Sequence, residues 1–168
     1  YTFFVDLAAA DSNLAQALRA HWGFVEDVLS RTREQTDFTH RWLTRLGEGV
    51  IVGNAITERG NTHGSNATRL VRRDSAWVLN GKKFYSTGSG YADWIMVAAT
   101  GADDEPVSLT VPATAPGVDI IDDWDGFGQK LTASGTTAFR DVIVEDAEIF
   151  PTGHGLDSGE RTAFGQAA

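Results

Sequence analysis

The chain has 168 residues, of which 42% are hydrophobic, with no cysteine and a formal net charge of -9. A chain of this length buries roughly 70% of its unfolded surface without disulfides, and the lack of cysteine excludes thiolate metal sites and thiol nucleophiles. The negative charge argues against nucleic acid or an anionic membrane as the main partner, because both require a basic face. No apolar run approaches the roughly 18 residues of a membrane span. The N-terminus lacks the basic region of a signal peptide, so a cytoplasmic protein is expected.

Residues 1–48 have helical periodicity and are expected to be the end of an N-terminal helical domain. Asp11-Ser12 separates two helices, and Thr32-x-x-Gln35 is the pattern of a capping box for a third, which ends at Gly47-Glu-Gly49. The lone histidines, His21 and His40, are expected to be packing or surface residues. The second helix carries one apolar stripe, predicted to be its buried face: Leu14, Leu18, Trp22, Val25 and Leu29.

From residue 49 to 151 the sequence changes to short strands separated by Gly, Asn, Asp and Pro. This spacing is typical of a β-barrel or sandwich. The expected strands are 50–57, 67–73, 76–79, 82–87, 93–99, 106–111, 117–121 and 137–144. Residues 152–168 are expected to be a linker and the start of a C-terminal helical domain. The predicted fold class is therefore α+β, with a helical segment followed by a mainly antiparallel β-barrel or sandwich domain.

Asn80-Gly81 is the strongest turn signal in the chain, because a type I′ turn requires positive φ at both central residues. A two-residue turn there places Leu79 opposite Lys82 and Trp77 opposite Phe84. Alternation then puts Phe84 and Ser86 on one face and Tyr85 and Thr87 on the other. An aromatic ring followed two residues later by a hydroxyl can stack on a flat polar ring and bond its edge. A plain surface hairpin is the alternative.

The polar strand at 54–57 and the loop of small residues after it form a second candidate ligand-binding segment. Asn54 and Ile56 share one face of the strand, and small residues let backbone N–H groups approach a ligand closely. An ordinary polar strand end is the alternative. The histidines follow no metal or catalytic-triad spacing, so no metal site is expected. The glycine motifs at 47–53 and 88–90 lack the strand–loop–helix context of a dinucleotide site.

Several motifs, in this order, resemble the acyl-CoA dehydrogenase superfamily: Ala55-Ile-Thr-Glu58, a Gly-Ser loop, Leu79–Thr87, Ala92-Asp-Trp94, Gly126–Thr136 and Phe139–Val144. Dehydrogenases of this superfamily usually have Thr-Glu-Pro, whereas this chain has Arg59 in place of the proline. The following loop is longer, Asn66 replaces an aspartate, and Tyr85 replaces a tryptophan. With these departures the chain is most similar to the flavin-dependent monooxygenase branch, which includes sulfone and dibenzothiophene monooxygenases.

The resemblance implies a flavin between the β domain and C-terminal helices that this sequence does not contain. It implies catalytic roles for Asn54 and Thr87 near the reactive edge of the flavin. The implied cofactor-binding residues are Ile56, Thr57, Gly64, Ser65, Tyr85, Ser86 and Thr87. In the monooxygenase branch, reduced FMN from a separate reductase reacts with oxygen on a small organic substrate, such as an organosulfur compound. A homotetramer is also implied.

Two other interpretations stay open. An acyl-CoA dehydrogenase with FAD would use a carboxylate base that lies in or near the C-terminal domain, outside this sequence. A non-catalytic fragment, lacking the C-terminal half of the site, is the third possibility, and the chain alone is expected to be inactive. The residues present name no substrate, because its pocket is formed largely by the absent helices.

Overall fold

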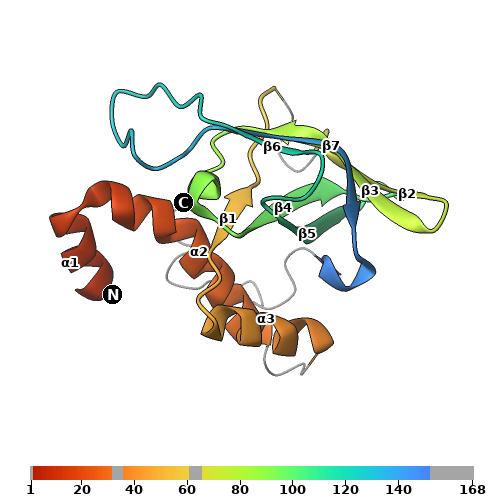
Figure 1. The fold of residues 1–168 in the computed structure, drawn as a ribbon, viewed down its shortest axis with the longest axis horizontal. Helices are drawn as coiled ribbons and strands as arrows, with labels where there is room; N and C mark the ends of the chain where they lie inside the picture. Colours follow the sequence, from red (N-terminus) through yellow and green to blue (C-terminus); the bar gives the residue numbers. More distant parts are fainter. Residues whose placement is uncertain (1, 32–35, 61–65, 152–168) are drawn as a thin grey trace.

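The computed structural model describes residues 2–31, 36–60 and 66–151, which form three α-helices beside a β-sheet (Figure 1). The helices are α1 (Thr2–Ala10), α2 (Ser12–Ser30) and α3 (Asp37–Gly47). The strands are β1 (Val52–Ala55), β2 (Arg69–Arg73), β3 (Ala76–Lys83), β4 (Trp94–Thr100), β5 (Pro106–Pro112), β6 (Val118–Ile121), β7 (Thr136–Val144) and β8 (Ile149–Pro151), with short 3-10 helices η2 (Ser89–Tyr91) and η3 (Asp146–Glu148). The α+β class is confirmed. None of the described helices combines the length and the apolar character that crossing a bilayer requires.

The sheet has the order β6-β7-β3-β2-β4-β5-β8, with β1 paired to β4 beside this path. Most ladders are antiparallel, as predicted, whereas β1–β4 and the single pair between β2 and β4 are parallel. Among the described residues the end strands β6 and β8 do not pair with each other. The sheet is therefore open in this part of the chain, and a closed barrel is not formed.

Two hydrophobic clusters hold the described residues together. The larger lies within the β-sheet and includes Leu70, Leu79, Ile95, Leu109 and Phe139. The smaller joins α2 and α3 to the sheet through Phe24, Val28, Trp42, Val52 and Phe150. The Trp42 ring is fully buried there, with centroids 4.7 Å from Phe24 and 5.4 Å from Trp94.

The predicted start of the second helix is confirmed in α2, but the predicted buried face is wrong. Asp11 caps the helix, accepting the backbone N–H groups of Asn13 and Leu14 at 2.8 and 3.2 Å. Leu14 and Leu29, at the ends of the predicted stripe, are 46% and 51% exposed. The residues that are buried instead are Ala17, His21, Phe24 and Val28. Apolar residues occupy more than one face of α2, and packing against the sheet decides which face is buried.

His21 attaches α2 to the sheet. Its Nδ1 accepts the backbone N–H of Val52 at 3.2 Å, and burial lowers the pKa of His21. A neutral imidazole is needed, because only an unprotonated ring nitrogen accepts a hydrogen bond. The packing role predicted for this lone helical histidine is confirmed.

The third helix begins later than its predicted capping box. Its N-cap is Thr36, whose side chain accepts the backbone N–H of Thr39 at 3.2 Å. The Thr32-x-x-Gln35 pattern lies outside the described residues. The helix ends at Gly47, as predicted.

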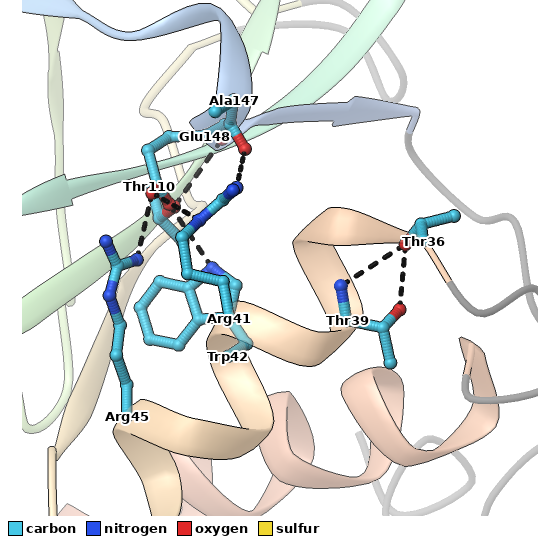
Figure 2. Close-up of polar contacts among 8 residues, drawn as sticks. All are labelled: Thr36, Thr39, Arg41, Trp42, Arg45, Thr110, Ala147 and Glu148. Carbon is cyan, nitrogen blue, oxygen red and sulfur yellow. Dashed lines mark hydrogen bonds and ion pairs between the residues drawn. The ribbon is translucent and has the colours of Figure 1, made fainter.

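Glu148 connects α3 to the sheet, as Figure 2 shows. Its buried carboxylate accepts hydrogen bonds from Trp42 Nε1 at 3.2 Å, Arg45 at 2.9 Å and Thr110 Oγ1 at 2.6 Å. Arg41 forms an ion pair with the same carboxylate at 3.3 Å and also donates to the Ala147 carbonyl. One carboxylate on η3 therefore holds both α3 and β5.

The predicted turn at Asn80-Gly81 is wrong. β3 continues from Ala76 to Lys83, so the expected strands 76–79 and 82–87 are not two arms of a hairpin. The hairpin of this region lies between β2 and β3, where Arg73 pairs with Ala76 across Asp74 and Ser75. Asp74 has the positive φ, 53°, that such a short turn requires. The pairing of Leu79 with Lys82 and of Trp77 with Phe84 is therefore also wrong.

Asn80 and Gly81 lie where β3 pairs with the long strand β7. The register of that ladder shifts between Leu79 and Gly81, and the Asn80 side chain exchanges hydrogen bonds with Asp141 at 2.9 and 3.0 Å. A Cβ at Gly81 would lie 2.6 Å from Thr68 Cα, so only glycine fits this close approach. The tertiary pairing thus overrides the local turn preference.

Candidate functional site

A cleft of about 420 Å³ lies between α2, the end of β1 and the segments that follow β3 and β6. This volume is within the range of roughly 300–1,000 Å³ that is usual for small-molecule sites. The cleft brings together Asn54, Ile56, Thr57, Tyr85 and Thr87, five of the residues that the sequence predicted as a site.

Ser86, Gly64 and Ser65 are the other predicted site residues. Ser86 is buried and does not line the cleft, although Tyr85 and Thr87 on either side do, and its backbone N–H donates to the Gly135 carbonyl at 2.9 Å. Gly64 and Ser65 are outside the described residues. The catalytic and cofactor-binding roles of all these residues stay predictions.

Sequence reasoning missed half of the lining: Gln16 and Arg19 on α2, and Trp124, Gln129 and Ser134 after β6. Gly88 explains how α2 comes so close, because a Cβ there would lie 2.3 Å from the Ala17 carbonyl oxygen. Gly88 also has φ of +77°, a backbone conformation that favours glycine. Nothing local in α2 marks this contact, since it depends on a residue far along the chain.

Tyr85 presents its ring to the cleft from an unusual backbone conformation. Its φ is +57°, which is rare for a bulky residue. The conformation is held on both sides, because Phe84 N donates to the Thr57 carbonyl at 2.8 Å and Ser86 N donates to Gly135. The ring is 46% exposed, with its centroid 6.1 Å from that of Trp124 in an edge-to-face arrangement. Strain of this kind is concentrated at ligand sites.

A chain of buried hydroxyl groups links Thr87 to the backbone of Gln129, and both of these residues line the cleft. Thr87 Oγ1 lies 2.9 Å from Ser134 Oγ, which lies 2.7 Å from Thr132 Oγ1. The chain ends where the Thr132 hydroxyl donates to the Gln129 carbonyl at 2.9 Å. The hydrogen bond to Ser134 therefore fixes the Thr87 hydroxyl at the edge of the cleft.

A buried ion pair supports the backbone beside the cleft. Lys83 is 0% exposed, and its Nζ lies 2.7 Å from Glu58 Oε1. The same ammonium donates to Asn66 Oδ1 at 2.9 Å and to the Ile56 carbonyl at 3.1 Å. Three partners match the three protons of a lysine ammonium. Lys83 thus fixes the backbone at Ile56 and holds Asn66, on the far side of the loop, close to it.

The Glu58 carboxylate is held in its ionised form. It also accepts the backbone N–H groups of Ala67 and Thr68 at 2.6 and 2.9 Å. Burial raises the pKa of Glu58, but hydrogen bonds from Lys83, Thr68 and the Ala67 backbone outweigh it and lower the pKa from 4.5 to about 2. Burial lowers the pKa of Lys83, and the Glu58 charge opposes that change.

We expect this pair to make folding stability sensitive to acid. Because the folded-state pKa of Glu58 is depressed, its contribution is fully present above pH 4.5 and is lost as the pH falls toward about 2. Urea unfolding at pH 7, 5 and 3 measures the effect. Glu58→Gln should lose less stability between pH 5 and 3 than the unmodified chain. Glu105→Gln, at an exposed position, should follow the unmodified curve, and an equal acid loss in Glu58→Gln would contradict the assignment.

The described lining of the cleft carries one positive charge. Arg19 is the only charged side chain among the described residues that line it, and those residues include no carboxylate. The remaining lining consists of amides, hydroxyls, two aromatic rings and Ile56. Such a surface suits a flat polar ring with hydrogen-bonding edges, and it offers no general base among the residues that the structure describes.

Comparison with known proteins adds three findings. Residues 53–142 match the family "Acyl-CoA dehydrogenase, middle domain". The dibenzothiophene monooxygenase of Rhodococcus erythropolis is 29% identical over 158 residues, covering 86% of this chain and 36% of that enzyme. An amino sugar nitrososynthase of Streptomyces rubradiris is 31% identical over 172 residues, covering 96% of this chain and 38% of the relative. The chain thus spans less than half the length of these relatives.

The fold is shared with solved structures. The FMN-bound TdsC structure from Paenibacillus sp. A11-2 superposes with a TM-score of 0.75 at 24% identity. The match covers 89% of this chain and 38% of TdsC. At this identity the similarity establishes the common fold of the helices and sheet.

Proposed function

The chain belongs to the acyl-CoA dehydrogenase family, and from that premise we propose that the protein is a flavin-dependent monooxygenase. It would use reduced FMN and oxygen on a small organic substrate, with an organosulfur compound as the leading candidate. The observation that carries this proposal is the cleft of about 420 Å³ in which Asn54, Ile56, Thr57, Tyr85 and Thr87 converge from separate segments of the chain.

The lining fits a flavin. Tyr85 and Ile56 leave exposed apolar surface at the cleft, which the flat face of an isoalloxazine can cover. The Asn54 amide and the Thr87 hydroxyl provide hydrogen-bonding groups for the polar edge of the ring, and Thr57 adds a further hydroxyl. When bound, reduced flavin supplies the two electrons that activate oxygen. The protein's own residues would hold the ring, fix its orientation and keep water away from it.

The relatives named above support a monooxygenase over a dehydrogenase. They are a dibenzothiophene monooxygenase and an amino sugar nitrososynthase. Their names refer to a sulfur compound and to an amino sugar, so we propose that the substrate carries an electron-rich heteroatom.

Partners of the complete protein follow from the same resemblance. We infer a separate reductase that delivers reduced FMN, a homotetramer, and a location in the cytoplasm. Size-exclusion chromatography with light scattering on the complete protein tests the tetramer.

Isotopically labelled oxygen tests the reaction. The complete protein is mixed with reduced FMN, labelled oxygen and dibenzothiophene, and the product is examined by mass spectrometry. One labelled oxygen atom should enter the sulfur compound and the other should leave as water, with both electrons drawn from the flavin. Unlabelled product would refute the proposal. Octanoyl-CoA that bleaches a tightly bound FAD would instead establish the dehydrogenase.

Flavin binding tests the assigned residues. In the complete protein, Tyr85→Ala and Thr87→Val should each weaken FMN binding by about tenfold, equivalent to about 1.4 kcal/mol, because they remove stacking area or a hydrogen bond. Fluorescence quenching of FMN measures the affinity. Tyr91→Ala is the matched control, since the Tyr91 ring is exposed and lies outside this cleft. Equal FMN affinity in all three variants and the unmodified protein would rule out these assignments.

A further inference from the structure

The hydroxyl chain behind Thr87 has a direction that can be read from its hydrogen-bond inventory. Each of Thr87, Ser134 and Thr132 has one hydroxyl hydrogen to donate. The Gln129 carbonyl at the other end can only accept, and it lies 2.9 Å from Thr132 Oγ1. The same carbonyl accepts longer bonds from Trp124 Nε1 at 3.2 Å and from the Thr132 backbone N–H at 3.3 Å. If Thr132 donates there, Ser134 must donate to Thr132 across 2.7 Å, and Thr87 must donate to Ser134 across 2.9 Å.

The opposite direction is geometrically poorer. It requires Thr132 to donate to Ser134 and Ser134 to donate to Thr87, so the Gln129 carbonyl, 2.9 Å from Thr132 Oγ1, receives no hydrogen from that hydroxyl. Thr87 would then donate into the cleft or to the Tyr85 carbonyl. The distance from Thr87 Oγ1 to the Tyr85 carbonyl is 3.4 Å, beyond the 2.5–3.0 Å usual for a hydroxyl donor. The Tyr85 carbonyl also already accepts the Thr87 backbone N–H at 2.8 Å. The direction toward Gln129 uses three short bonds and leaves no hydroxyl hydrogen unused.

The consequence concerns what Thr87 shows to the cleft. With its hydrogen committed to Ser134, the Thr87 oxygen has only lone pairs left, so it can accept a hydrogen bond but not donate one. Thr132 is 1% exposed and does not line the cleft, so water cannot compete for its hydroxyl hydrogen, whereas Ser134 is 7% exposed and lines the cleft beside Thr87. Ser134 and Thr132 therefore determine whether the Thr87 hydroxyl donates or accepts a hydrogen bond in the cleft.

We propose that Ser134 and Thr132 are positioning residues that fix the Thr87 hydroxyl as a hydrogen-bond acceptor, and that this makes the site prefer reduced flavin over oxidised flavin. This inference rests on the proposed function, with the N5 edge of the flavin facing Thr87. Oxidised flavin has a bare N5 that only accepts, whereas reduced flavin carries an N5–H that donates. A Thr87 oxygen that can only accept therefore forms a hydrogen bond with the N5–H of reduced flavin. With oxidised flavin, the lone pairs of Thr87 and N5 would face and repel each other.

The test compares the affinity of the complete protein for oxidised FMN and, anaerobically, for reduced FMN. Ser134→Ala frees the Thr87 hydrogen to bond oxidised N5, so the preference for reduced FMN should fall about three- to tenfold, the range expected for one neutral hydrogen bond. Thr132→Val should lower the preference in the same direction, because Ser134 then donates to Thr87. Thr132 does not line the cleft, so a direct contact with flavin does not explain that result. Ser134→Thr and Thr132→Ser, which keep the hydroxyls, should preserve the preference.

A purely structural role gives a different result. Equal weakening of both forms in Ser134→Ala and Thr132→Val, with an unchanged preference, would overturn the inference. Neutron diffraction of the flavin-free protein in heavy water separates this outcome from a failure of the proposed function. A deuteron between Thr87 and Ser134 supports the polarity whether or not flavin binds. A Thr87 deuteron that points into the cleft or toward the Tyr85 carbonyl overturns it.

Discussion

Glu148→Ala should lower the free energy of unfolding by about 3–5 kcal/mol, the usual cost of removing one member of a buried ionic network. The buried carboxylate is 2% exposed and accepts hydrogen bonds from Trp42, Arg45 and Thr110 (Figure 2). Its removal leaves the Trp42 N–H buried without an acceptor and leaves the Thr110 hydroxyl only the backbone carbonyl of residue 148, 3.5 Å away. It also removes the negative charge opposite Arg41 and Arg45. Urea unfolding followed by tryptophan fluorescence measures the loss.

Two further variants separate charge from shape at Glu148. Glu148→Gln keeps an acceptor of similar size, so it should cost less than Glu148→Ala but still leave both arginines without a counter-charge. Glu145→Ala, three residues earlier and exposed, should change stability by no more than about 0.5 kcal/mol. If Glu148→Ala and Glu145→Ala unfold at the same urea concentration, the Glu148 contacts between α3 and the sheet do not contribute to the free energy of unfolding.

Lys83→Met should be similarly destabilising, at about 3–5 kcal/mol, because it leaves the Glu58 carboxylate buried without its cation. The loss should also reach the proposed flavin site. Lys83 holds the Ile56 carbonyl and the Asn66 side chain, so the backbone that lines the cleft loses its anchor. Urea unfolding reports the stability, and FMN fluorescence quenching on the complete protein reports the cleft.

A second substitution tests whether charge causes the Lys83 effect. In Lys83→Met with Glu58→Gln, the neutral amide oxygen still accepts the Ala67 and Thr68 N–H groups, and no buried charge is left. We therefore expect the double variant to recover part of the stability lost in Lys83→Met. Lys82→Met is the matched control, since the neighbouring Lys82 is exposed. A Lys82→Met loss as large as that of Lys83→Met would show that the ion pair is not the reason.

Motif resemblance predicted much of the candidate site, whereas local turn rules failed beside it. Asn54, Ile56, Thr57, Tyr85 and Thr87 line one cleft, as the resemblance implied for a ligand site. The hairpin predicted at Asn80-Gly81 is wrong, because both residues lie inside β3. Tyr85 and Thr87 face the cleft for another reason: the backbone at Tyr85 adopts φ of +57° between two anchoring hydrogen bonds.

Periodicity, caps and ordered motifs were enough to predict helices followed by strands, the α+β class and the family, because these are local or short-range properties of the chain. They divided β3 into two strands and did not reveal β8. The buried face of α2, the position of the β2–β3 hairpin and the burial of Lys83 against Glu58 could be seen only in the folded chain. The tertiary structure also brought Arg19 and Ser134 to the same cleft as Tyr85. Each of these outcomes depends on partners distant in sequence, whose packing outweighs local preferences of about 1 kcal/mol or less.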